Sequence, residues 1–251
     1  MKLSIIIPCF NEEANIPTLV ARLREAIERE PDLSAPSAYE ILLIDDGSAD
    51  GTWAAIEAEQ ANNPPVRGVR HEQNQGIAEA WATGAREANG LFLLTMDADL
   101  QYRPADVPLL YKEVIEGVAD LVQGHRVEQV APGPFRTALS VVLSGLLNAI
   151  FGLGLKDAKS GFVCYRSEAF RDILADRRAF HCFQHFITVA AAARNYRIRQ
   201  VPVVFDSRHA GQSFITNPLA FSLRALVDLP RALLYYRFKR PVPRMAPIET
   251  R

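Results

Sequence analysis

Two aspartates, Asp97 and Asp99, follow directly after the uninterrupted apolar run 91–96, LFLLTM. Such a run is typical of a buried strand in a parallel sheet, and ligands of open α/β sheets bind at the carboxyl ends of the strands. Two carboxylates so close together repel each other unless a cation lies between them. Mg²⁺ prefers carboxylate oxygens and usually completes its shell with phosphate oxygens and water. We therefore predict a metal–diphosphate site here. The alternative is a solvated acidic turn before a helix that begins near Pro104.

Two more acidic loops stand where predicted strands end. Asn11-Glu12 follows an apolar strand over 4–7, and Asp45-Asp46 follows a strand over 40–44. Because the carboxyl ends of parallel strands lie at one edge of a sheet, we expect these side chains to converge with those of the first site. Converging carboxylates cost free energy unless a ligand or a cation accompanies them. The three loops together therefore favour a binding site over three unrelated turns.

The elements that must position these loops alternate between strands and helices. Strands are predicted over 4–7, 40–44, 66–70 and 91–96, and helices over about 12–29, 50–61 and 76–88. This order indicates βαβ units and a mostly parallel central sheet flanked by helices, an α/β fold. The second half is less regular. Its predicted helices cover 104–116, 137–155, 182–194 and 219–238, and its predicted strands cover 119–123, 160–165 and 197–205.

Composition sets broad limits on the class of protein and on its partners. The 251 residues are 49% hydrophobic and 23% charged, which suits one globular α/β domain with an ample core. The formal net charge of −1 gives no indication of a nucleic-acid partner. Because Cys9, Cys164 and Cys182 are scattered, we predict neither a disulfide framework nor a zinc site, and a reducing compartment fits.

A set of spaced motifs extends well beyond the acidic loops. Its members are Ser4–Glu13, Asp45–Thr52, Asn74-Gln75-Gly76, Asp97–Gln101, Gly124-His125-Arg126, Arg136, Asp157, Ser160-Gly161-Phe162, Val201-Pro202-Val203, Arg208 and Gly211-Gln212-Ser213. These motifs resemble those of the family 2 glycosyltransferases, which have the GT-A fold. More narrowly, they are similar to the dolichyl-phosphate mannose synthase and polyprenyl-phosphate glycosyltransferase branch. The set covers roughly the first 215 residues. Each motif alone is weak evidence for the family, but the whole set with its spacing is specific.

The resemblance implies a fold, an activity and a set of site residues. Residues 1–216 would form a GT-A domain with a Rossmann-like, mostly parallel sheet, divided into a nucleotide-binding half up to residue 100 and an acceptor half beyond it. The implied activity is inverting transfer of a hexose from a GDP- or UDP-sugar, dependent on Mg²⁺ or Mn²⁺. The nucleotide sugar would be held by Pro8, Phe10, Asn11, Glu12, Asp45, Asp46 and Asp97, the metal by Asp97, Asp99 and Gln101, and the acceptor by Ser160, Gly161 and Ser213.

The acceptor implied by the resemblance is a polyprenyl phosphate, such as dolichyl or undecaprenyl phosphate. A phosphate is already ionised at neutral pH, so it needs no general base, only positive groups that hold it in line. Arg126, Arg136 and Arg208 suit this role because a guanidinium group can donate two parallel hydrogen bonds to two oxygens of a phosphate. Together with Asp99, these arginines are predicted catalytic residues. The alternative for each arginine is a surface ion pair.

Two other functions stay open from the sequence. A family 2 transferase with a sugar-hydroxyl acceptor would need a general base, for which Asp157 is the best available candidate. A non-catalytic scaffold that binds nucleotide sugars is the alternative from another class. The complete set of Asp97, Asp99 and Gln101 argues against the scaffold.

The stretch 137–155 is apolar and without charge, which raises the question of a membrane. Ser140, Ser144 and Asn148 recur every four residues and form one polar stripe. We therefore expect a helix that lies in the membrane interface with its apolar sides toward lipid. A core helix of the domain is the alternative.

The segment 217–251 is predicted to be an amphipathic helix over 219–238 followed by a basic tail. Arg224, Asp228 and Arg231 would share one face of the helix, and Pro230 would bend it. Aromatic and basic side chains near its end are of the kind found at anionic membrane surfaces. With no later hydrophobic span in the sequence, we expect a cytoplasmic catalytic domain that binds peripherally to the inner face of a membrane.

Overall fold

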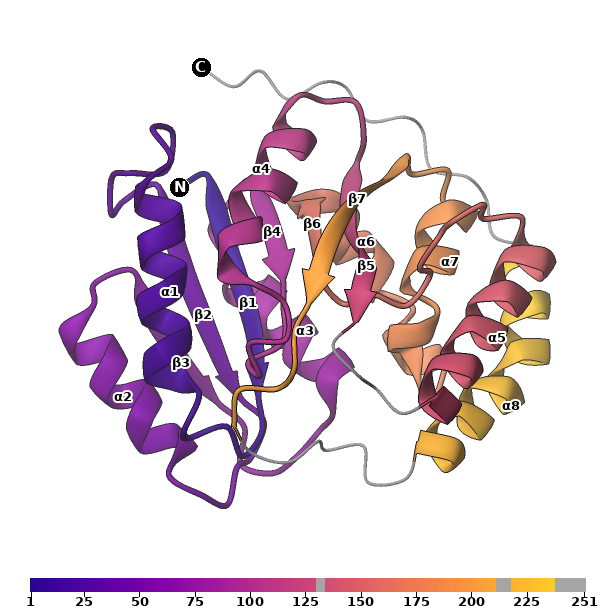
Figure 1. Ribbon diagram of the computed structural model, residues 1–251, viewed down its shortest axis with the longest axis horizontal. Helices are drawn as coiled ribbons and strands as arrows, with labels where there is room; N and C mark the ends of the chain where they lie inside the picture. Colours follow the sequence, from indigo (N-terminus) through magenta and orange to yellow (C-terminus); the bar gives the residue numbers. More distant parts are fainter. Residues whose placement is uncertain (130–133, 211–217, 238–251) are drawn as a thin grey trace.

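The computed structural model describes residues 1–129, 134–210 and 218–237, with the backbone alone at 128–129, 134–141, 218–226 and 237 (Figure 1). Within these ranges, seven strands form one sheet in the order β3-β2-β1-β4-β6-β5-β7. The strands are β1 (Leu3–Cys9), β2 (Tyr39–Asp45), β3 (Val66–Arg70), β4 (Phe92–Thr95), β5 (Leu121–Gln129), β6 (Val163–Arg166) and β7 (Ile198–Phe205).

The central strands are buried because their sequences are almost continuously apolar. Every residue of β2 and of β4 is buried, as expected where helices cover both faces of a sheet. β1 pairs in parallel with β2 and β4, β2 with β3, and β5 with β7, whereas β6 runs antiparallel between β4 and β5. The start of β6 therefore lies at the same edge as the carboxyl ends of the other strands. The predicted mostly parallel α/β sheet is confirmed.

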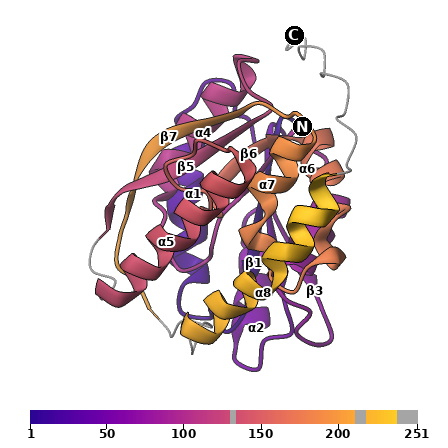
Figure 2. The same cartoon turned by 90° about the vertical axis from the view of Figure 1, so that its right-hand side faces the viewer.

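Helices cover both faces of the sheet. One face carries α1 (Ile16–Glu28), α2 (Thr52–Asn62) and α4 (Val107–Ile115), and the other carries α3 (Ile77–Glu87), α6 (Ser167–Leu174) and α7 (Ile187–Ala193). At the outer side of this second layer, α5 (Pro134–Phe151) and α8 (Pro218–Arg237) lie side by side (Figure 2). Short 3₁₀ turns span Pro104–Asp106 (η1), Arg177–Ala179 (η2) and Phe183–His185 (η3). Each face of the sheet thus has its own apolar core.

Most predicted elements are present, with shifts at their boundaries. The helix expected over 182–194 is divided between η3 and α7, and α6 is a helix that the sequence patterns do not predict. The predicted division near residue 100 falls between β4 and η1, inside one continuous sheet. That division remains a prediction.

The turn after α5 has a local cause. α5 stops at Phe151 because Gly152 and Gly154 follow with φ values of +64° and +65°, a conformation that favours glycine. Asn148 fixes the turn through both ends of its amide. Its Nδ2 donates to the Leu155 carbonyl at 2.6 Å, and its Oδ1 accepts from the Leu155 N–H at 3.0 Å.

α5 has one buried face and one exposed apolar face. Leu143 and Leu147 are buried in the core, whereas Val142, Leu146 and Ile150 are exposed at intervals of four residues. An apolar row of this kind is typical of a helix that contacts something besides water.

The polar stripe predicted for α5 points toward the protein where its side chains are described. Ser144 is buried, and Asn148 is occupied by the turn that follows the helix. Ser140 lies outside the described side chains. The exposed side of the described part of α5 is therefore the apolar one, and binding of this helix in a membrane interface stays a prediction.

The predicted shared polar face of α8 is wrong at Asp228. This side chain is 1% exposed and accepts hydrogen bonds from the backbone N–H groups of His181 and Cys182 and from His181 Nδ1, at 2.8, 3.1 and 2.8 Å. Arg231, by contrast, is exposed. Asp228 turns inward because three donors of the 181–182 turn need an acceptor there. Arg224 and the basic tail lie outside the described side chains.

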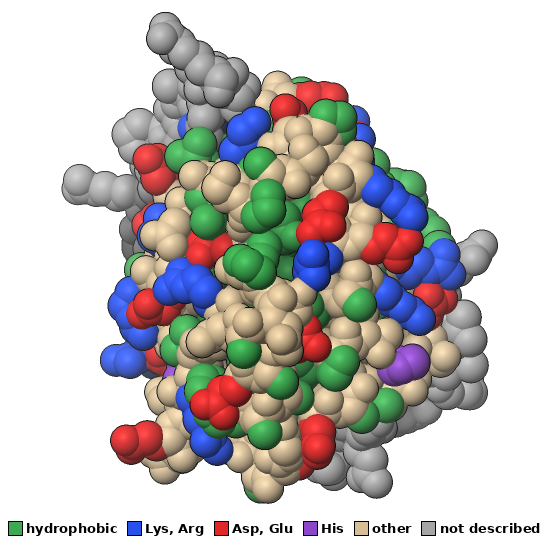
Figure 3. All heavy atoms as spheres, turned by 90° about the vertical axis from the view of Figure 1, so that its left-hand side faces the viewer, with side chains coloured by type: hydrophobic (Ala, Val, Ile, Leu, Met, Phe, Trp, Pro, Cys, Tyr) green, Lys and Arg blue, Asp and Glu red, His purple; other side chains and the backbone are tan. Residues whose placement is uncertain are grey.

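α8 continues through Pro230 without interruption. Among the described residues, no helix combines the length and the apolar character needed to cross a bilayer. On the side of the molecule formed by α1 and α2, acidic and basic side chains are interspersed (Figure 3). That view offers no single-sign surface of the kind a nucleic acid would need.

A pair of neighbouring leucines tests the orientation of α5. Leu147 is fully buried and Leu146 is 37% exposed. Leu147→Ala should lower the free energy of unfolding by about 2–5 kcal/mol because it leaves a cavity. Leu146→Ala should cost less than about 1 kcal/mol. Chemical denaturation of both variants measures the difference, and equal losses would contradict the orientation of the helix.

Candidate functional site

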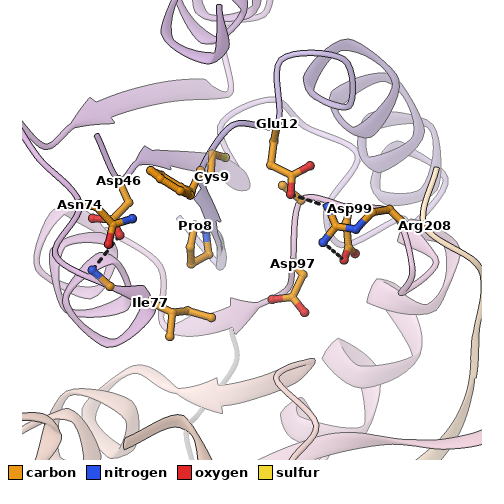
Figure 4. A pocket seen from close by; sticks show the side chains of 12 residues that line it. Pro8, Cys9, Glu12, Asp46, Asn74, Ile77, Asp97, Asp99 and Arg208 are labelled. Carbon is orange, nitrogen blue, oxygen red and sulfur yellow. Dashed lines mark hydrogen bonds and ion pairs between the residues drawn. The ribbon is translucent and has the colours of Figure 1, made fainter. Parts of the chain in front are cut away.

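A pocket opens at the sheet edge where β1, β2 and β4 end (Figure 4). Asp46 and Asn74 stand on one side of it, Asp97, Asp99 and Arg208 stand on the other, and β1 lies between them. The described residues that line it are Pro8, Cys9, Phe10, Glu12, Asp46, Asn74, Gly76, Ile77, Asp97, Ala98, Asp99 and Arg208. All but the last come from the first hundred residues, and the three predicted acidic loops converge as expected.

A sharp turn after β4 brings two carboxylates into the pocket. The hydroxyl of Thr95, the last residue of β4, donates to the Gly161 carbonyl at 2.7 Å and ties β4 to the start of β6. Leu100 has a φ of +62°, a left-handed conformation that few non-glycine residues adopt. Across this turn, Asp99 Oδ1 accepts the Gln101 N–H at 3.1 Å. This turn, rather than a helix or a strand, holds Asp99 beside Asp97.

Enclosure makes the negative charge of this pair costly. Burial, and after it the charge of Asp99, raises the pKa of Asp97 to about 7, although Arg208 and Arg126 oppose the shift. Burial also raises the pKa of Asp99 against the attraction of Arg208. Within the described residues, no hydrogen-bond donor contacts the Asp97 carboxylate. The pocket is therefore short of positive charge at Asp97.

Arg208 bridges two of the acidic side chains. Its Nη1 lies 2.7 Å from Glu12 Oε1, and its Nη2 lies 2.8 Å from Asp99 Oδ2. Glu12 also accepts from Asn15 Nδ2 at 2.5 Å, and burial raises the pKa of Glu12 in spite of Arg208. Because Arg208 follows β7, this bridge joins the end of the sheet domain to its beginning.

The donor set fits a divalent cation that is shared with a ligand. Within the described ranges, no group of three or more His, Cys, Asp or Glu side chains is arranged to hold a metal alone. Asp97 and Asp99 offer carboxylate oxygens where positive charge is lacking, which suits Mg²⁺ or Mn²⁺ with phosphate and water in its other positions. In Gln101, the predicted third ligand, Nε2 donates to the Asp206 carbonyl at 3.2 Å, and the role of its Oε1 at the metal stays a prediction.

Asp46 forms the opposite wall of the pocket. Its Oδ1 accepts from the Gln75 N–H at 2.9 Å and its Oδ2 from the Gly76 N–H at 2.8 Å. Both donors lie just before Ile77, the first residue of α3. A carboxylate at a helix N-terminus is stabilised by the helix dipole. The structure thus fixes Asp46 against the start of α3.

The other predicted nucleotide-sugar residues divide into two groups. Pro8 and Phe10 line the pocket. Asn11 braces the loop instead: its N–H donates to Ser48 Oγ at 3.0 Å, and its Oδ1 accepts from Ala49. Asp45 is not among the lining residues either: its carboxylate accepts the Ser48 N–H at 2.9 Å and pairs with Arg70 at 3.2 Å.

Arg126 and Asp157 form a two-point ion pair beside the pocket. Nε of Arg126 lies 2.6 Å from Oδ2 of Asp157, and Nη2 lies 3.1 Å from Oδ1. The guanidinium group also stands over the Phe205 ring, 5.2 Å from its centroid. Burial opposes ionisation of Asp157, but Arg126 and the Lys159 N–H outweigh it and lower the pKa of Asp157. The pair fixes the plane of the arginine.

The predicted acceptor residues are only partly brought to this region. Gly161 adjoins Asp97, since a Cβ on it would lie 4.0 Å from Asp97 Oδ1. Ser160 is buried, and its hydroxyl bonds to Tyr102 at 2.9 Å rather than facing the pocket. The side chain of Arg136 and the whole of Ser213 lie outside the described residues.

Several pocket residues were not among the predicted site residues, although Asn74 and Gly76 belong to a motif that supported the family resemblance. Asn74, Gly76 and Ile77 line the pocket. Their signal was a polar, glycine-containing loop after β3, at the same sheet edge as the acidic loops. His71 bonds to Asp46 from behind, and nothing in the sequence distinguishes it from an ordinary histidine at the end of a strand.

A mostly parallel sheet with an acidic pocket at the carboxyl ends of its strands is typical of enzymes that bind nucleotides. Residues 4–174 match the family described as Glycosyl transferase family 2. The chain belongs to this family, as the spaced motifs indicated.

Individual relatives agree with the family. A dolichol-phosphate mannosyltransferase of Pyrococcus furiosus is 29% identical over 227 residues, which are 88% of this chain and 61% of that protein. The chain therefore spans less than two thirds of the length of this relative.

Solved structures share the fold at low identity. Staphylococcus aureus TarS in complex with UDP-GlcNAc has a TM-score of 0.67 at 18% identity, covering 97% of this chain and 68% of that one. The mannosyltransferase PcManGT of Pyrobaculum calidifontis, in complex with GDP-Man and Mn²⁺, has a TM-score of 0.62 at 18% identity, covering 96% and 66%. The predicted GT-A fold is confirmed.

Raising the pH should destabilise the metal-free protein through Asp97. Its pKa is about 7 in the folded state, against an ordinary value of about 4. Between these values the folded state holds a proton that the unfolded state has released, so stability falls as the pH rises through this window. Asp97→Asn lacks the effect, so its stability relative to the parent should rise by about 2 kcal/mol between pH 5 and pH 8, and the two proteins should be closest in stability near pH 4. Denaturant unfolding in a chelator measures this.

Asp206→Asn is the matched control for this measurement. A hydrogen bond from Arg103 lowers the pKa of Asp206, so this substitution should reduce stability at pH 8 rather than increase it. The assignment of the raised pKa to Asp97 would fail if the difference in stability between Asp97→Asn and the parent protein were the same at pH 5 and at pH 8.

Proposed function

We propose that this protein transfers a hexose, with inversion, from a nucleotide-diphosphate sugar to a polyprenyl phosphate, in the presence of Mg²⁺ or Mn²⁺. The observation that carries the proposal is the enclosed pair of Asp97 and Asp99 at the end of β4, opposite Asp46 in one pocket. A ligand with a hydrogen-bonding nucleoside at one end and a charged diphosphate at the other matches these two walls. Bound at Asp97 and Asp99, the metal would neutralise charge that develops on the leaving diphosphate.

The relatives support this donor class. PcManGT was solved with GDP-Man and Mn²⁺, and TarS with UDP-GlcNAc. Both are nucleotide sugars whose diphosphate would face the paired aspartates. The donor panel described below determines whether the nucleotide is GDP or UDP and which sugar is transferred.

The acceptor half of the proposal depends on two arginines. Arg208 and Arg126 both act electrostatically on Asp97, so they flank the place where a donor sugar would meet its acceptor. A lipid phosphate there would be held by guanidinium groups without needing a base. The name of the Pyrococcus furiosus relative, a dolichol-phosphate mannosyltransferase, supports this class of acceptor.

A hydroxyl acceptor is less well supported by the geometry. It would need a general base, and the pKa of Asp157 is lowered because Arg126 occupies both of its oxygens. A carboxylate in this state is a weak proton acceptor. Asp157 is better suited to positioning Arg126 than to removing a proton.

We further propose that the protein meets its lipid substrate at a membrane surface through α5 and α8. The two helices lie side by side, and both expose apolar side chains: Val142, Leu146 and Ile150 on α5, and Val227 and Leu234 on α8. An acceptor with a long apolar chain remains in the bilayer, so the enzyme must come to it. Helices with one exposed apolar face suit binding in the interface.

The transfer reaction is tested with a panel of radiolabelled GDP- and UDP-hexoses, Mn²⁺, and either polyprenyl phosphate or water-soluble sugars. We expect label in the organic phase with one donor. Asp99→Ala should reduce turnover by at least about 100-fold because charge on the leaving group is no longer balanced. Asp106→Ala, a carboxylate outside the pocket, is the control. Label only in water-soluble products would replace the lipid acceptor with a sugar.

Membrane binding is tested by flotation with anionic phospholipid vesicles. The double variant Leu146→Glu and Leu234→Glu should reduce the bound fraction at least about fivefold, because charged groups resist burial in the interface. Leu109→Glu and Val118→Glu place the same charge at exposed apolar positions on and after α4. These controls should bind as the parent protein does. An equal loss of vesicle binding in the control variants and in the double variant would contradict the proposal that α5 and α8 form the membrane-binding surface.

A further inference from the structure

His71 joins the wall of the pocket to the helix behind it. It directly follows β3, and its ring is 7% exposed. Nδ1 lies 2.7 Å from Asp46 Oδ1, and Nε2 lies 3.0 Å from the hydroxyl oxygen of Thr83 on α3. Since a carboxylate oxygen can only accept, Nδ1 carries the proton and donates to Asp46. The backbone N–H of His71 also donates to the Asp45 carbonyl at 2.8 Å.

Among the described residues, the donors that contact Asp46 leave it with one open acceptor position. A carboxylate offers about four acceptor sites. The two on Oδ1 are taken by His71 and the Gln75 N–H, and one on Oδ2 is taken by the Gly76 N–H. Asp46 itself lines the pocket. The remaining acceptor therefore belongs to Oδ2, the oxygen that His71 does not hold.

We propose that His71 is a positioning residue for the donor nucleotide: it holds Asp46 Oδ1 so that Oδ2 can accept a hydrogen bond from an N–H or O–H group of the nucleoside. This inference rests on the proposed function, because it assigns the nucleoside to the Asp46 side of the pocket. The diphosphate then lies on the side of Asp97 and Asp99. His71 touches no ligand itself and acts through Asp46.

Thr83 extends the same constraint to α3. Its hydroxyl holds the far side of the His71 ring, and α3 begins at Ile77, which lines the pocket next to Gly76. The ring therefore fixes the carboxylate of Asp46 and the helix whose N-terminus faces it at the same time. Both contacts are buried, so water does not readily replace them.

The inference is tested by comparing two ligands that use different walls. Equilibrium dissociation constants are measured for GDP and UDP, and for pyrophosphate alone, all with Mn²⁺. His71→Leu should weaken binding of the preferred nucleotide about tenfold and leave pyrophosphate within about twofold. Asp97→Asn should weaken both ligands. His71→Asn, which places an amide N–H near the position of Nδ1, should recover most of the nucleotide affinity.

A matched control separates this role from general stability. His181→Leu removes a similar histidine–aspartate contact, 2.8 Å from Nδ1 to Asp228, far along the chain from the pocket residues. It should leave nucleotide binding unchanged. Thr83→Val replaces His71→Leu in the test if His71→Leu does not fold. It removes only the hydrogen bond between Thr83 and the His71 ring, and it should weaken nucleotide binding by about threefold.

Three results would overturn the inference while the proposed function stands. In the first, His71→Leu binds the nucleotide as tightly as the parent does. In the second, His71→Leu loses affinity for the nucleotide and for pyrophosphate by the same factor. In the third, His71→Asn binds the nucleotide no better than His71→Leu does. A parent protein that binds neither nucleotide nor pyrophosphate would instead reject the proposed function together with the inference.

Discussion

Negative charge gathered at one edge of a parallel sheet is the constraint on which this structure depends. The strand order brings Glu12, Asp46, Asp97 and Asp99 to the same pocket. Each is stabilised differently. Asp46 accepts two backbone N–H groups and His71, whereas Glu12 and Asp99 share Arg208. Asp97 alone has no hydrogen-bond donor in the described part of the chain, so nothing there offsets by hydrogen bonding the burial and the charge of Asp99 that raise its pKa.

The balance of these charges requires the whole domain to be folded. Arg208 reaches Glu12 across 196 positions of sequence because β7 returns to the same edge as β1. The antiparallel strand β6 lies between β4 and β5, and Gly161, just before its start, lies beside Asp97. The left-handed conformation of Leu100 is also tolerated only in the folded domain, because the surrounding contacts hold the turn in place.

Sequence patterns predicted the sheet and the acidic loops because both depend on local features. Apolar runs of strand length, with a polar break after each, mark the strands and place Asp97 and Asp46 at their ends. Side-chain direction inside a helix or a turn depends instead on tertiary partners. Asp228 was expected to share an outward face with Arg231, yet three donors of the 181–182 turn draw it inward.

The same limit explains what the sequence missed within the site. Gln101 was expected beside the metal, and the Asp206 carbonyl fixes the Nε2 end of its amide. Ser160 was expected at the acceptor, but Tyr102 holds its hydroxyl. His71 had no distinguishing spacing at all, because its role arises only when β3 lies beside β2 and α3 packs behind them. In each case a partner remote in sequence decides where the polar atoms point.

Charge balance also bears on how a diphosphate could enter this pocket. In the described part of the chain, Arg208 pairs with both Glu12 and Asp99, while the nearby Arg126 is already paired with Asp157. A diphosphate would add further negative charge to a site where burial already opposes ionisation of Asp97 and Asp99. Without an added cation, the ligand and the carboxylates would repel each other at close range in a medium of low dielectric. Under the proposed function, the acidic pair would oppose free anions and would admit a diphosphate only together with a divalent cation, so the cation would take part in donor recognition as well as in catalysis.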